Sequence, residues 1–360
     1  MGLSARLRGS QWRPLGSAIG VGAIGGFIFS LFGLPLAWML GAMVATTIAS
    51  LAGLRVNVPN RVRTLFIAIL GIMLGSAFTP EIVDQAAQWA GSLAIQAGYV
   101  ALATGLSYTI YLRVGGYDRV TAYFSSTPGG ISEMVLLGES LGGDIRTISL
   151  NHAVRVLIVI GVIPFYFRFV EGISLPSAPA TGAIGDLAPL DFLILAGCGI
   201  VGYLVAARLR VPAYAIIGPL FLSAAIHLAG LTASSVPSPI AASAQLVVGA
   251  ALGSRFVGLS LGQMGRAAWL AAITAIVLIG SAAAVASLAS LFLDVGPSTM
   301  FLALAPGGLA EMSLIALALG VDTAFVTIMH ILRVVLVVIL APYAFRILPG
   351  RAPRAPSPGD

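Results

Sequence analysis

Two sets of ionisable side chains recur with the same spacing in an otherwise apolar chain. They are Glu133, His152 and Arg155 in the first set and Glu311, His330 and Arg333 in the second. Within each set the histidine and the arginine lie three positions apart, which places both on one face of a helix. Ionisable groups inside membrane segments are costly and by default mark a pathway or a coupling site. The arginines predict attraction of an anion, and the histidines, which titrate near physiological pH, predict coupled proton movement.

Each glutamate follows a Pro-Gly-Gly break, in "TPGGISEM" at 127–134 and in "APGGLAEM" at 305–312. Glycine has no side chain, so a ligand can approach its backbone closely. The N–H groups at the start of a following helix carry partial positive charge and bind anions. We therefore expect the two ionisable sets to bind substrate together with the break residues. These are Thr127, Pro128, Gly129 and Gly130 in the first break and Pro306, Gly307 and Gly308 in the second.

Two structural interpretations compete with a binding site at these breaks. In one, the glutamate of each set pairs with the arginine of the same set and braces the break. In the other, Thr127 is a helix N-cap, Pro128 lies in the first turn and Glu133 favours the positive helix end. Bracing does not require two glycines at both breaks, whereas close approach of a ligand does. Ala305 replaces Thr127 in the second break, so polar substrate contacts are expected mainly from the first.

The composition predicts which elements must hold these residues. Hydrophobic residues make up 58% of the 360 residues and charged residues 9%, whereas soluble domains carry roughly 25% charge. About 20 apolar residues cross a bilayer as a helix, and a lipid environment leaves few alternatives to helices. The sequence therefore predicts an all-α polytopic membrane protein with no room for a soluble catalytic or DNA-binding domain. The apolar stretches lie near 15–31, 36–52, 64–78, 90–112, 146–167, 190–207, 213–230, 240–254, 267–293 and 323–347.

The basic balance does not indicate a nucleic-acid partner. All 19 cationic residues are arginines, and they are scattered over many loops. This distribution favours topology signals and contacts with lipid headgroups. Cys198 is the single cysteine, which excludes a disulfide framework or a cysteine-based metal site. We expect no cofactor and no metal.

An internal repeat organises the chain. The two Pro-Gly-Gly blocks begin at residues 127 and 305, which are 178 positions apart, and the same offset relates the other members of the two ionisable sets. Upstream the offset is 177 and pairs Pro35 with Pro212. We predict a first membrane repeat at 1–170, a linker at 171–190, a second repeat at 191–348 and a disordered tail at 349–360. Because residues 15–52 belong to the repeat, a cleaved signal peptide is not expected.

Arginine placement predicts that the two copies are inverted. Cytoplasmic loops are enriched in arginine. In the first copy the loop at 53–63 carries three arginines and the loop at 79–88 is acidic, whereas the matching loop at 231–239 is uncharged and that at 255–266 carries two arginines. Both termini are therefore expected in the cytoplasm, and the linker at 171–190 outside.

Inverted copies need an odd number of crossings, and each copy has five apolar stretches besides its break. The arms of the first break, near 120–127 and 129–141, are too short to span at 1.5 Å per residue, and Pro-Gly-Gly favours a turn. We therefore predict a re-entrant hairpin, with a second at 297–320. Such a backbone is tolerated only inside protein or beside a water-filled cavity. The alternative is a broken helix that crosses fully, which would give 12 spans in all.

The duplicated PGG-x-x-E-M blocks, each followed by His-x-x-Arg, resemble the AbrB-type membrane proteins, whose halves are described as a duplicated AbrB domain. The resemblance covers nearly the whole chain. The family carries the labels of a regulator of gene expression, an ammonia monooxygenase and a permease, so it implies no single activity.

Three classes of function are open from the sequence. Inverted repeats with binding near the midplane are typical of secondary transporters, so we favour transport of a small anionic solute across the bacterial inner membrane, coupled to protons. A membrane sensor would use the same pocket and act on gene expression through a partner. A metal enzyme is the least favoured, since beyond His152 and His330 the chain holds only His227. The expected partners are the lipid bilayer and the solute, and a homo-oligomer stays open.

Overall fold

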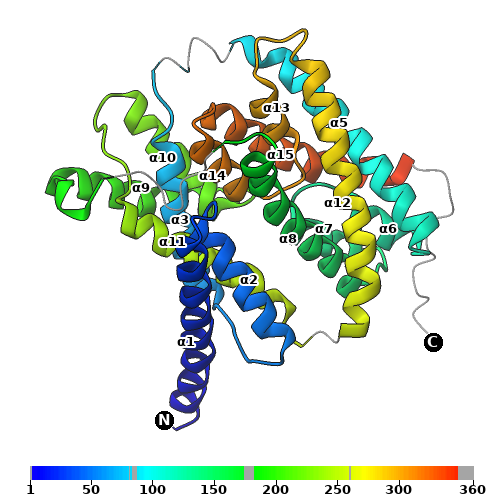
Figure 1. Ribbon diagram of the computed structural model, residues 1–360, viewed down its shortest axis with the longest axis horizontal. Coiled ribbons are helices and arrows are strands. Elements are labelled where there is room, and N and C mark those ends of the chain that lie inside the picture. The colour runs from blue at the N-terminus through cyan, green and yellow to red at the C-terminus, as the bar shows by residue number, and fades with distance from the viewer. Residues whose placement is uncertain (1, 81, 83–86, 174–181, 259–260, 348–360) are drawn as a thin grey trace.

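The computed structural model describes residues 2–80, 82, 87–173, 182–258 and 261–347. Within these ranges all regular secondary structure is helical and no strand is present (Figure 1). The prediction of an all-α chain is therefore confirmed for the described residues. The longer helices are α1 (Gly2–Leu31), α5 (Ala90–Thr109), α8 (Ile145–Phe169), α9 (Pro189–Arg208), α12 (Leu261–Ala289) and α15 (Thr323–Ile347). Helices of intermediate length are α2 (Ala37–Leu51), α3 (Asn60–Gly75), α10 (Tyr214–Leu228) and α11 (Ser238–Gly253). The shortest α-helices described are α6 (Arg119–Ser126), α7 (Ile131–Ser140), α13 (Pro297–Leu304) and α14 (Leu309–Leu319).

Six of the described helices are long and apolar enough to cross a membrane, by length and composition. The four helices of intermediate length have 15 or 16 residues. At 1.5 Å per residue they extend about 23 Å, which is less than a hydrocarbon core of about 30 Å. Six of the ten predicted stretches thus make helices long enough to cross, and the stretches at 36–52, 64–78, 213–230 and 240–254 make helices that fall short of a full span.

Backbone geometry fixes where these shorter helices begin. Leu36 before α2 and Ala213 before α10 are left-handed, with φ of 46° and 52°, a conformation that interrupts a right-handed helix. Pro59 and Pro237 occupy the N-cap positions of α3 and α11. The four helices therefore begin directly after these residues, within four residues of the predicted starts.

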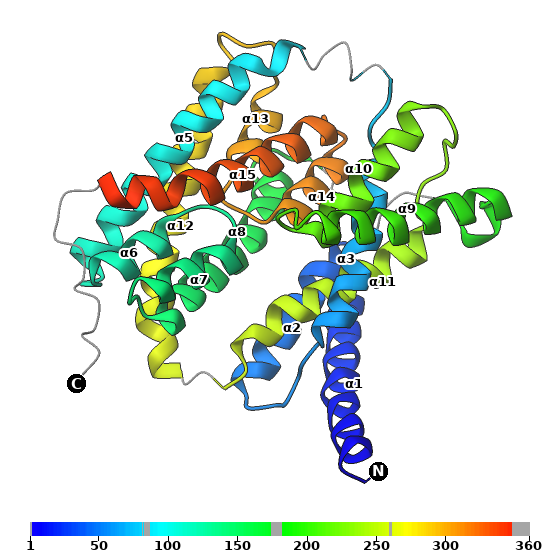
Figure 2. The ribbon, with the colours of Figure 1, turned by 180° about the vertical axis from the view of Figure 1, so that it is seen from behind.

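The four shorter helices pack on one another around close glycine contacts. Helix α3 contacts α10, and α2 contacts α11, on the side of the molecule from which α1 extends (Figure 2). A β-carbon at Gly75 in α3 would lie 2.5 Å from the carbonyl oxygen of Leu220, and one at Gly253 in α11 would lie 2.5 Å from that of Met43. Small residues allow such close approach of helix backbones. Glycine at these two positions therefore serves close helix packing.

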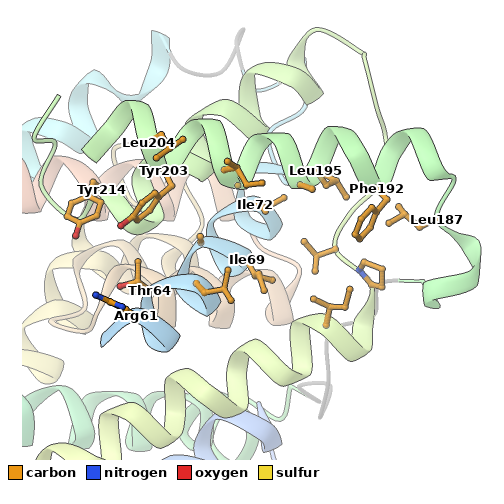
Figure 3. A pocket seen from close by; sticks show the side chains of 18 of the residues that line it. Arg61, Thr64, Ile69, Ile72, Leu187, Phe192, Leu195, Tyr203, Leu204 and Tyr214 are labelled. Carbon is orange, nitrogen blue, oxygen red and sulfur yellow. The ribbon is translucent and has the colours of Figure 1, made fainter. Parts of the chain in front are cut away.

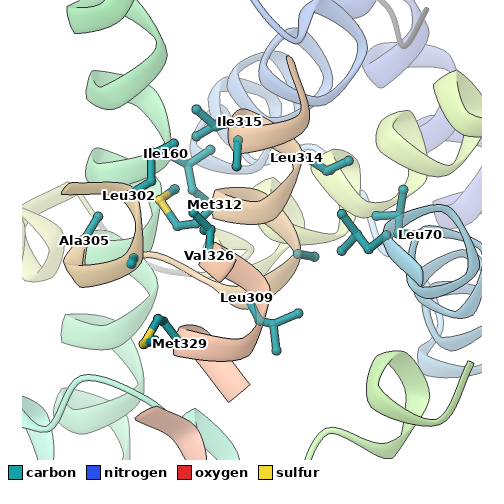
Figure 4. Close-up of a cluster of buried hydrophobic side chains, with 14 of the residues drawn as sticks. Leu70, Ile160, Leu302, Ala305, Leu309, Met312, Leu314, Ile315, Val326 and Met329 are labelled. Atoms are coloured by element: carbon teal, nitrogen blue, oxygen red, sulfur yellow. The ribbon is translucent and has the colours of Figure 1, made fainter. Parts of the chain in front are cut away.

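Helix α1 packs on α2 and α9 packs on α10, whereas the side of the molecule that contains both Pro-Gly-Gly breaks is formed by α5, α6, α7, α8, α12, α13, α14 and α15 (Figure 1). Figure 4 shows the apolar core around the second break, where Leu302 of α13 and Met312 of α14 lie beside Ile160 of α8 and Val326 of α15. Leu70 of α3 belongs to the same buried cluster. The second break is therefore held by helices from distant parts of the sequence.

Three predicted segments lie wholly or partly outside the described residues. The tail at 349–360 is entirely outside, as are residues 174–181 of the predicted linker. Glu81 and Asp84, which make the loop at 79–88 acidic, are outside as well.

Candidate functional site

Each Pro-Gly-Gly break separates two short helices. Helix α6 ends at Ser126 and α7 begins at Ile131, while α13 ends at Leu304 and α14 begins at Leu309. These helices have 8 to 11 residues, so at 1.5 Å per residue each extends about 12 to 17 Å. None is long enough to cross a bilayer by itself.

The first histidine and arginine are directed from α8 onto the end of α6. The Nε2 atom of His152 lies 2.8 Å from the carbonyl oxygen of Phe124 and donates to it. Arg155 donates through Nη1 to the carbonyl of Ser125, at 3.4 Å, and through Nη2 to that of Thr127, at 3.2 Å. Arg155 Nη2 also lies 3.0 Å from His152 Nδ1, which accepts from it. Both side chains are buried, with exposed fractions of 0% and 2%.

The second histidine and arginine make a matching arrangement from α15. His330 Nε2 donates to the carbonyl of Leu302 at 2.9 Å, again 28 residues earlier in the chain. Arg333 donates to the carbonyl of Ala305 at 2.5 Å and to that of Gly307 at 2.6 Å. The last carbonyls of a helix have no partner within it, and a cation is favoured at that end. The His-x-x-Arg pairs therefore cap the helix that precedes each break.

The predicted pairing of glutamate with arginine is wrong. Among the described residues, the hydrogen-bond partners of Arg155 and Arg333 are carbonyl oxygens and His152, and neither guanidinium has a carboxylate within ion-pair distance. Instead the glutamates belong to the first turns of α7 and α14. Backbone carbonyls at each break accept the arginine hydrogen bonds that the bracing interpretation gave to Glu133 and Glu311.

The predicted helix start at the first break also needs correction. Thr127 follows the last residue of α6 and is its C-cap, whereas the N-cap of α7 is Gly130. Pro128 therefore lies between the two helices and not in the first turn of α7. The part of that interpretation that places Glu133 at a helix N-terminus is confirmed.

Glycine is required for different physical reasons at the two breaks. Gly130 has φ of 59°, and Gly129 has φ of 147°, so both positions favour glycine by conformation. Gly308 has φ of −77°, which any residue adopts. A β-carbon there would instead collide with the carboxylate of Glu311. Access to backbone amides is thus not needed to explain glycine at the first break.

The two glutamates differ in burial and in electrostatic surroundings. Glu311 is 8% exposed and interacts electrostatically with Arg63 and Arg255, while Glu133 is half-buried. Gly129 is half-buried and its counterpart Gly307 is buried, while the other matching positions of the two breaks fall in the same burial class. The first break is therefore slightly the more accessible of the two.

Among the described residues, the two buried arginines of the site have no acidic counterpart. Arg155 and Arg333 lie close enough to repel each other electrostatically, and Tyr99 of α5 interacts with both. Within the described residues, the Nε atoms of both arginines, Nδ1 of His330 and the side-chain amide of Gln96 are buried without a hydrogen-bond partner. A buried cation without a counter-ion is unfavourable, so this region is electrostatically suited to an anion.

Tyr99 and Gln96 were missed in the sequence. They belong to a buried face of α5 that also contains Ser92, Ala103 and Ser107. The signal was available, because polar residues at steps of three and four within an apolar helix mark one face. Among the described residues, no group of three or more His, Cys, Asp or Glu could hold a metal ion.

Replacing Glu133 with glutamine is expected to change the free energy of unfolding by less than about 1 kcal/mol, because the change removes only a charge at a helix N-terminus. Glu311→Gln is the comparison, and its effect should be larger because that carboxylate is buried beside arginines. Thermal unfolding of both purified variants checks this. A loss of several kcal/mol for Glu133→Gln would contradict the structure, because a loss of that size indicates that the carboxylate belongs to a buried ion pair.

Comparison with known proteins finds relatives along nearly the whole chain. A model of the family described as "Transition state regulatory protein AbrB" matches residues 38–349. The chain is 27% identical over 355 residues to "Uncharacterized protein YhjN" of Bacillus subtilis (strain 168), covering 92% of each chain. It is 26% identical over 322 residues to "Putative regulator AbrB" of Escherichia coli (strain K12), covering 89% of this chain and 92% of the relative.

Proposed function

Because the chain belongs to the AbrB family, whose members named above span nearly its whole length, we propose that it is a multipass protein of the bacterial inner membrane that transports a small anionic solute. The proposal is of a binding and transport protein, not of an enzyme. One observation carries it: Arg155 and Arg333 are both 2% exposed, lie in each other's electrostatic field and have no carboxylate partner among the described residues. A bound anion would supply the missing charge.

The proposed architecture is a pair of inverted repeats, each with a re-entrant hairpin at its break. Two matching contacts support it, since His152 and His330 each donate to the carbonyl 28 residues earlier. Arg155 and Arg333 each also donate to a carbonyl 28 residues earlier. In inverted-repeat transporters, substrate sites lie where discontinuous helices meet near the midplane. The arginine distribution supports opposite orientations of the two copies.

Proton coupling is proposed at His330 more than at His152. The Nδ1 atom of His152 already accepts from Arg155. The Nδ1 atom of His330 is buried and has no partner among the described residues, and its Nε2 atom already donates to Leu302. Of the two, only the second imidazole therefore has a nitrogen free to accept a proton.

A ligand sensor is the second candidate, and the name of one relative favours it. The Escherichia coli protein is named a regulator, and the family description is also regulatory. A sensor would bind the same anion between the breaks and pass the signal to a partner, without net movement of solute. Binding alone therefore does not distinguish the two functions.

Two linked measurements test the proposal. A thermal-shift screen of the purified protein over organic anions, with pH varied, should find a ligand that raises the melting temperature by mass action. Uptake of that anion into proteoliposomes, driven by a pH gradient, is then expected for a transporter and not for a sensor. Copper and zinc belong in the same screen, since stabilisation by a metal but by no anion would overturn the proposal in favour of a metal protein.

The proposed orientation predicts which introduced cysteines react from which side. In a Cys198→Ala background, Ala183→Cys in the linker should react with an impermeant thiol reagent from the periplasmic side. Ala52→Cys, beside the arginine-containing loop, should react only from the cytoplasmic side. Both positions are exposed. Labelling of both from the same side would contradict the inverted arrangement.

A further inference from the structure

A cavity of about 760 Å³ lies away from the breaks, between α3, α9 and the start of α11. None of the residues assigned above to anion binding lines it. Its walls are apolar along most of their length, and Leu65, Ile200 and Leu204 on its walls are about 60% exposed. The cavity is therefore a groove that opens on the outer surface of the helices.

Polar and apolar side chains are separated along this groove. Arg61, Thr64 and the tyrosines Tyr203 and Tyr214 gather at one end, while Leu187, Phe192 and Leu195 line the other (Figure 3). The two tyrosine rings pack edge to face, with centroids 5.5 Å apart. Helix α9 ends just beyond Tyr203, at Arg208, and Arg208 and Arg210 are exposed. The polar end thus combines cationic groups and phenolic hydroxyls.

Small residues on both α3 and α9 line the groove. Ala68 of α3 and Ala196 of α9 line its wall. The proposed repeat pairs these positions with Leu246 and Ile19, which belong to a packed cluster between α11 and α1. The equivalent space in the other half is therefore filled by larger side chains. This difference makes the groove a feature of one half only.

The dimensions match one leaflet of a bilayer. From Arg61 to Ile72 along α3, and from Phe192 to Tyr203 along α9, the chain advances 11 residues. At 1.5 Å per residue this is about 16 Å, which is close to half of a hydrocarbon core of about 30 Å. A lipid with its headgroup at Arg61 could therefore lay an acyl chain along the whole apolar part.

We propose that this groove binds one anionic phospholipid, with its phosphate at Arg61 and the tyrosine pair and its acyl chains against α3 and α9. Charge complementarity favours an anionic headgroup over a zwitterionic one, since each arginine near a membrane surface contributes about 1 kcal/mol toward anionic lipid. The proposed orientation agrees, because the arginine-rich end faces the cytoplasmic leaflet. The site is separate from the anion site between the breaks.

Native mass spectrometry of the purified protein tests the proposal by measuring retention of phosphatidylglycerol. Phosphatidylcholine serves as the matched zwitterionic probe. Wild-type protein should retain one phosphatidylglycerol in preference to phosphatidylcholine. Arg61→Gln should weaken that retention roughly fivefold, whereas Arg113→Gln, at another exposed arginine, should not. The double variant Ala68→Leu with Ala196→Ile carries larger residues of the kind found at the paired positions and should abolish retention.

Several outcomes would overturn the proposal. Equal retention of both lipids would show that charge plays no part, and unchanged retention in the filled double variant would place the lipid elsewhere. If the double variant instead changes a dimer into a monomer and leaves lipid retention unaltered, the groove belongs to a second copy of the chain. Arg61 is exposed, so its variant is expected to fold and to give a result even if the double variant does not.

Discussion

Replacement of Arg333 with glutamine is expected to weaken binding of an organic anion at least about a hundredfold, which corresponds to roughly 2.7 kcal/mol. The guanidinium is 2% exposed and has no carboxylate partner among the described residues. In a medium of low dielectric constant its charge acts strongly on a nearby anion. Loss of that charge should therefore reduce affinity more than loss of a single hydrogen bond.

The same change is also expected to lower stability, and the two effects must be separated. Arg333 donates to the carbonyls of Ala305 and Gly307, and hydrogen bonds that involve a charged group contribute about 1.5–3 kcal/mol each. Affinity should therefore be obtained from the anion-dependent rise in melting temperature relative to that variant without anion. Arg333→Lys retains the charge but not the two-pronged donor geometry, so it should recover part of the affinity and little of the stability.

Arg346 provides a matched control in the same helix. It lies in the last turn of α15 and is exposed. Arg346→Gln therefore removes one positive charge, as Arg333→Gln does, but the charge removed is exposed and not buried. We expect no measurable change in anion affinity for this variant. Normal affinity in Arg333→Gln, or an equal loss in Arg346→Gln, would contradict an anion site between the two breaks.

The existence of the helices and breaks could be read from the sequence because both are local features. Long apolar runs predict helices, and Pro-Gly-Gly predicts where a helix stops. The arms expected near 120–127 and 129–141 are helices at Arg119–Ser126 and Ile131–Ser140. Helix periodicity likewise placed His152 and Arg155 on one face. In each case residues within a few turns determine the structure.

The partners of the ionisable groups could not be predicted in the same way. One interpretation of the sequence paired Arg155 with Glu133, since opposite charges in an apolar chain are expected to pair. The structure satisfies Arg155 with carbonyls that the break in the chain leaves free. Every residue has a backbone carbonyl, so composition and spacing do not indicate which carbonyls will accept a hydrogen bond from a distant arginine. Only the tertiary placement of α6 against α8 makes them available.

The backbone conformation at which α2 and α10 begin was beyond local reasoning. Their apolar stretches, predicted at 36–52 and 213–230, agree with the observed helices to within two residues, but each helix begins directly after a left-handed residue, Leu36 or Ala213. Neither leucine nor alanine marks a left-handed conformation, which is uncommon outside glycine and asparagine. The close packing of these helices at glycines is likewise not specified by the sequence alone.

That packing leads to the second large effect: Gly75→Ala and Gly253→Ala should each destabilise the protein by about 1–3 kcal/mol, as expected for overpacking. A β-carbon at Gly75 would lie 2.5 Å from both the carbonyl oxygen of Leu220 and the β-carbon of Ser223, and one at Gly253 would lie 2.5 Å from the carbonyl oxygen of Met43. Backbone atoms cannot rotate away as a side chain can, so the helices must separate.

The control is a glycine with open space around it. Gly197 in α9 has nothing within 4 Å of an added β-carbon, so Gly197→Ala should stabilise its helix by about 0.5–1 kcal/mol. Because α3–α10 and α2–α11 each join the first half of the chain to the second, the double variant Gly75→Ala with Gly253→Ala should lose about the sum of the two single effects, since the two sites make separate contacts. Thermal unfolding in detergent measures all four variants. If Gly75→Ala proved as stable as Gly197→Ala, α3 and α10 could not be in the close contact described, and the way the two halves join would have to be different.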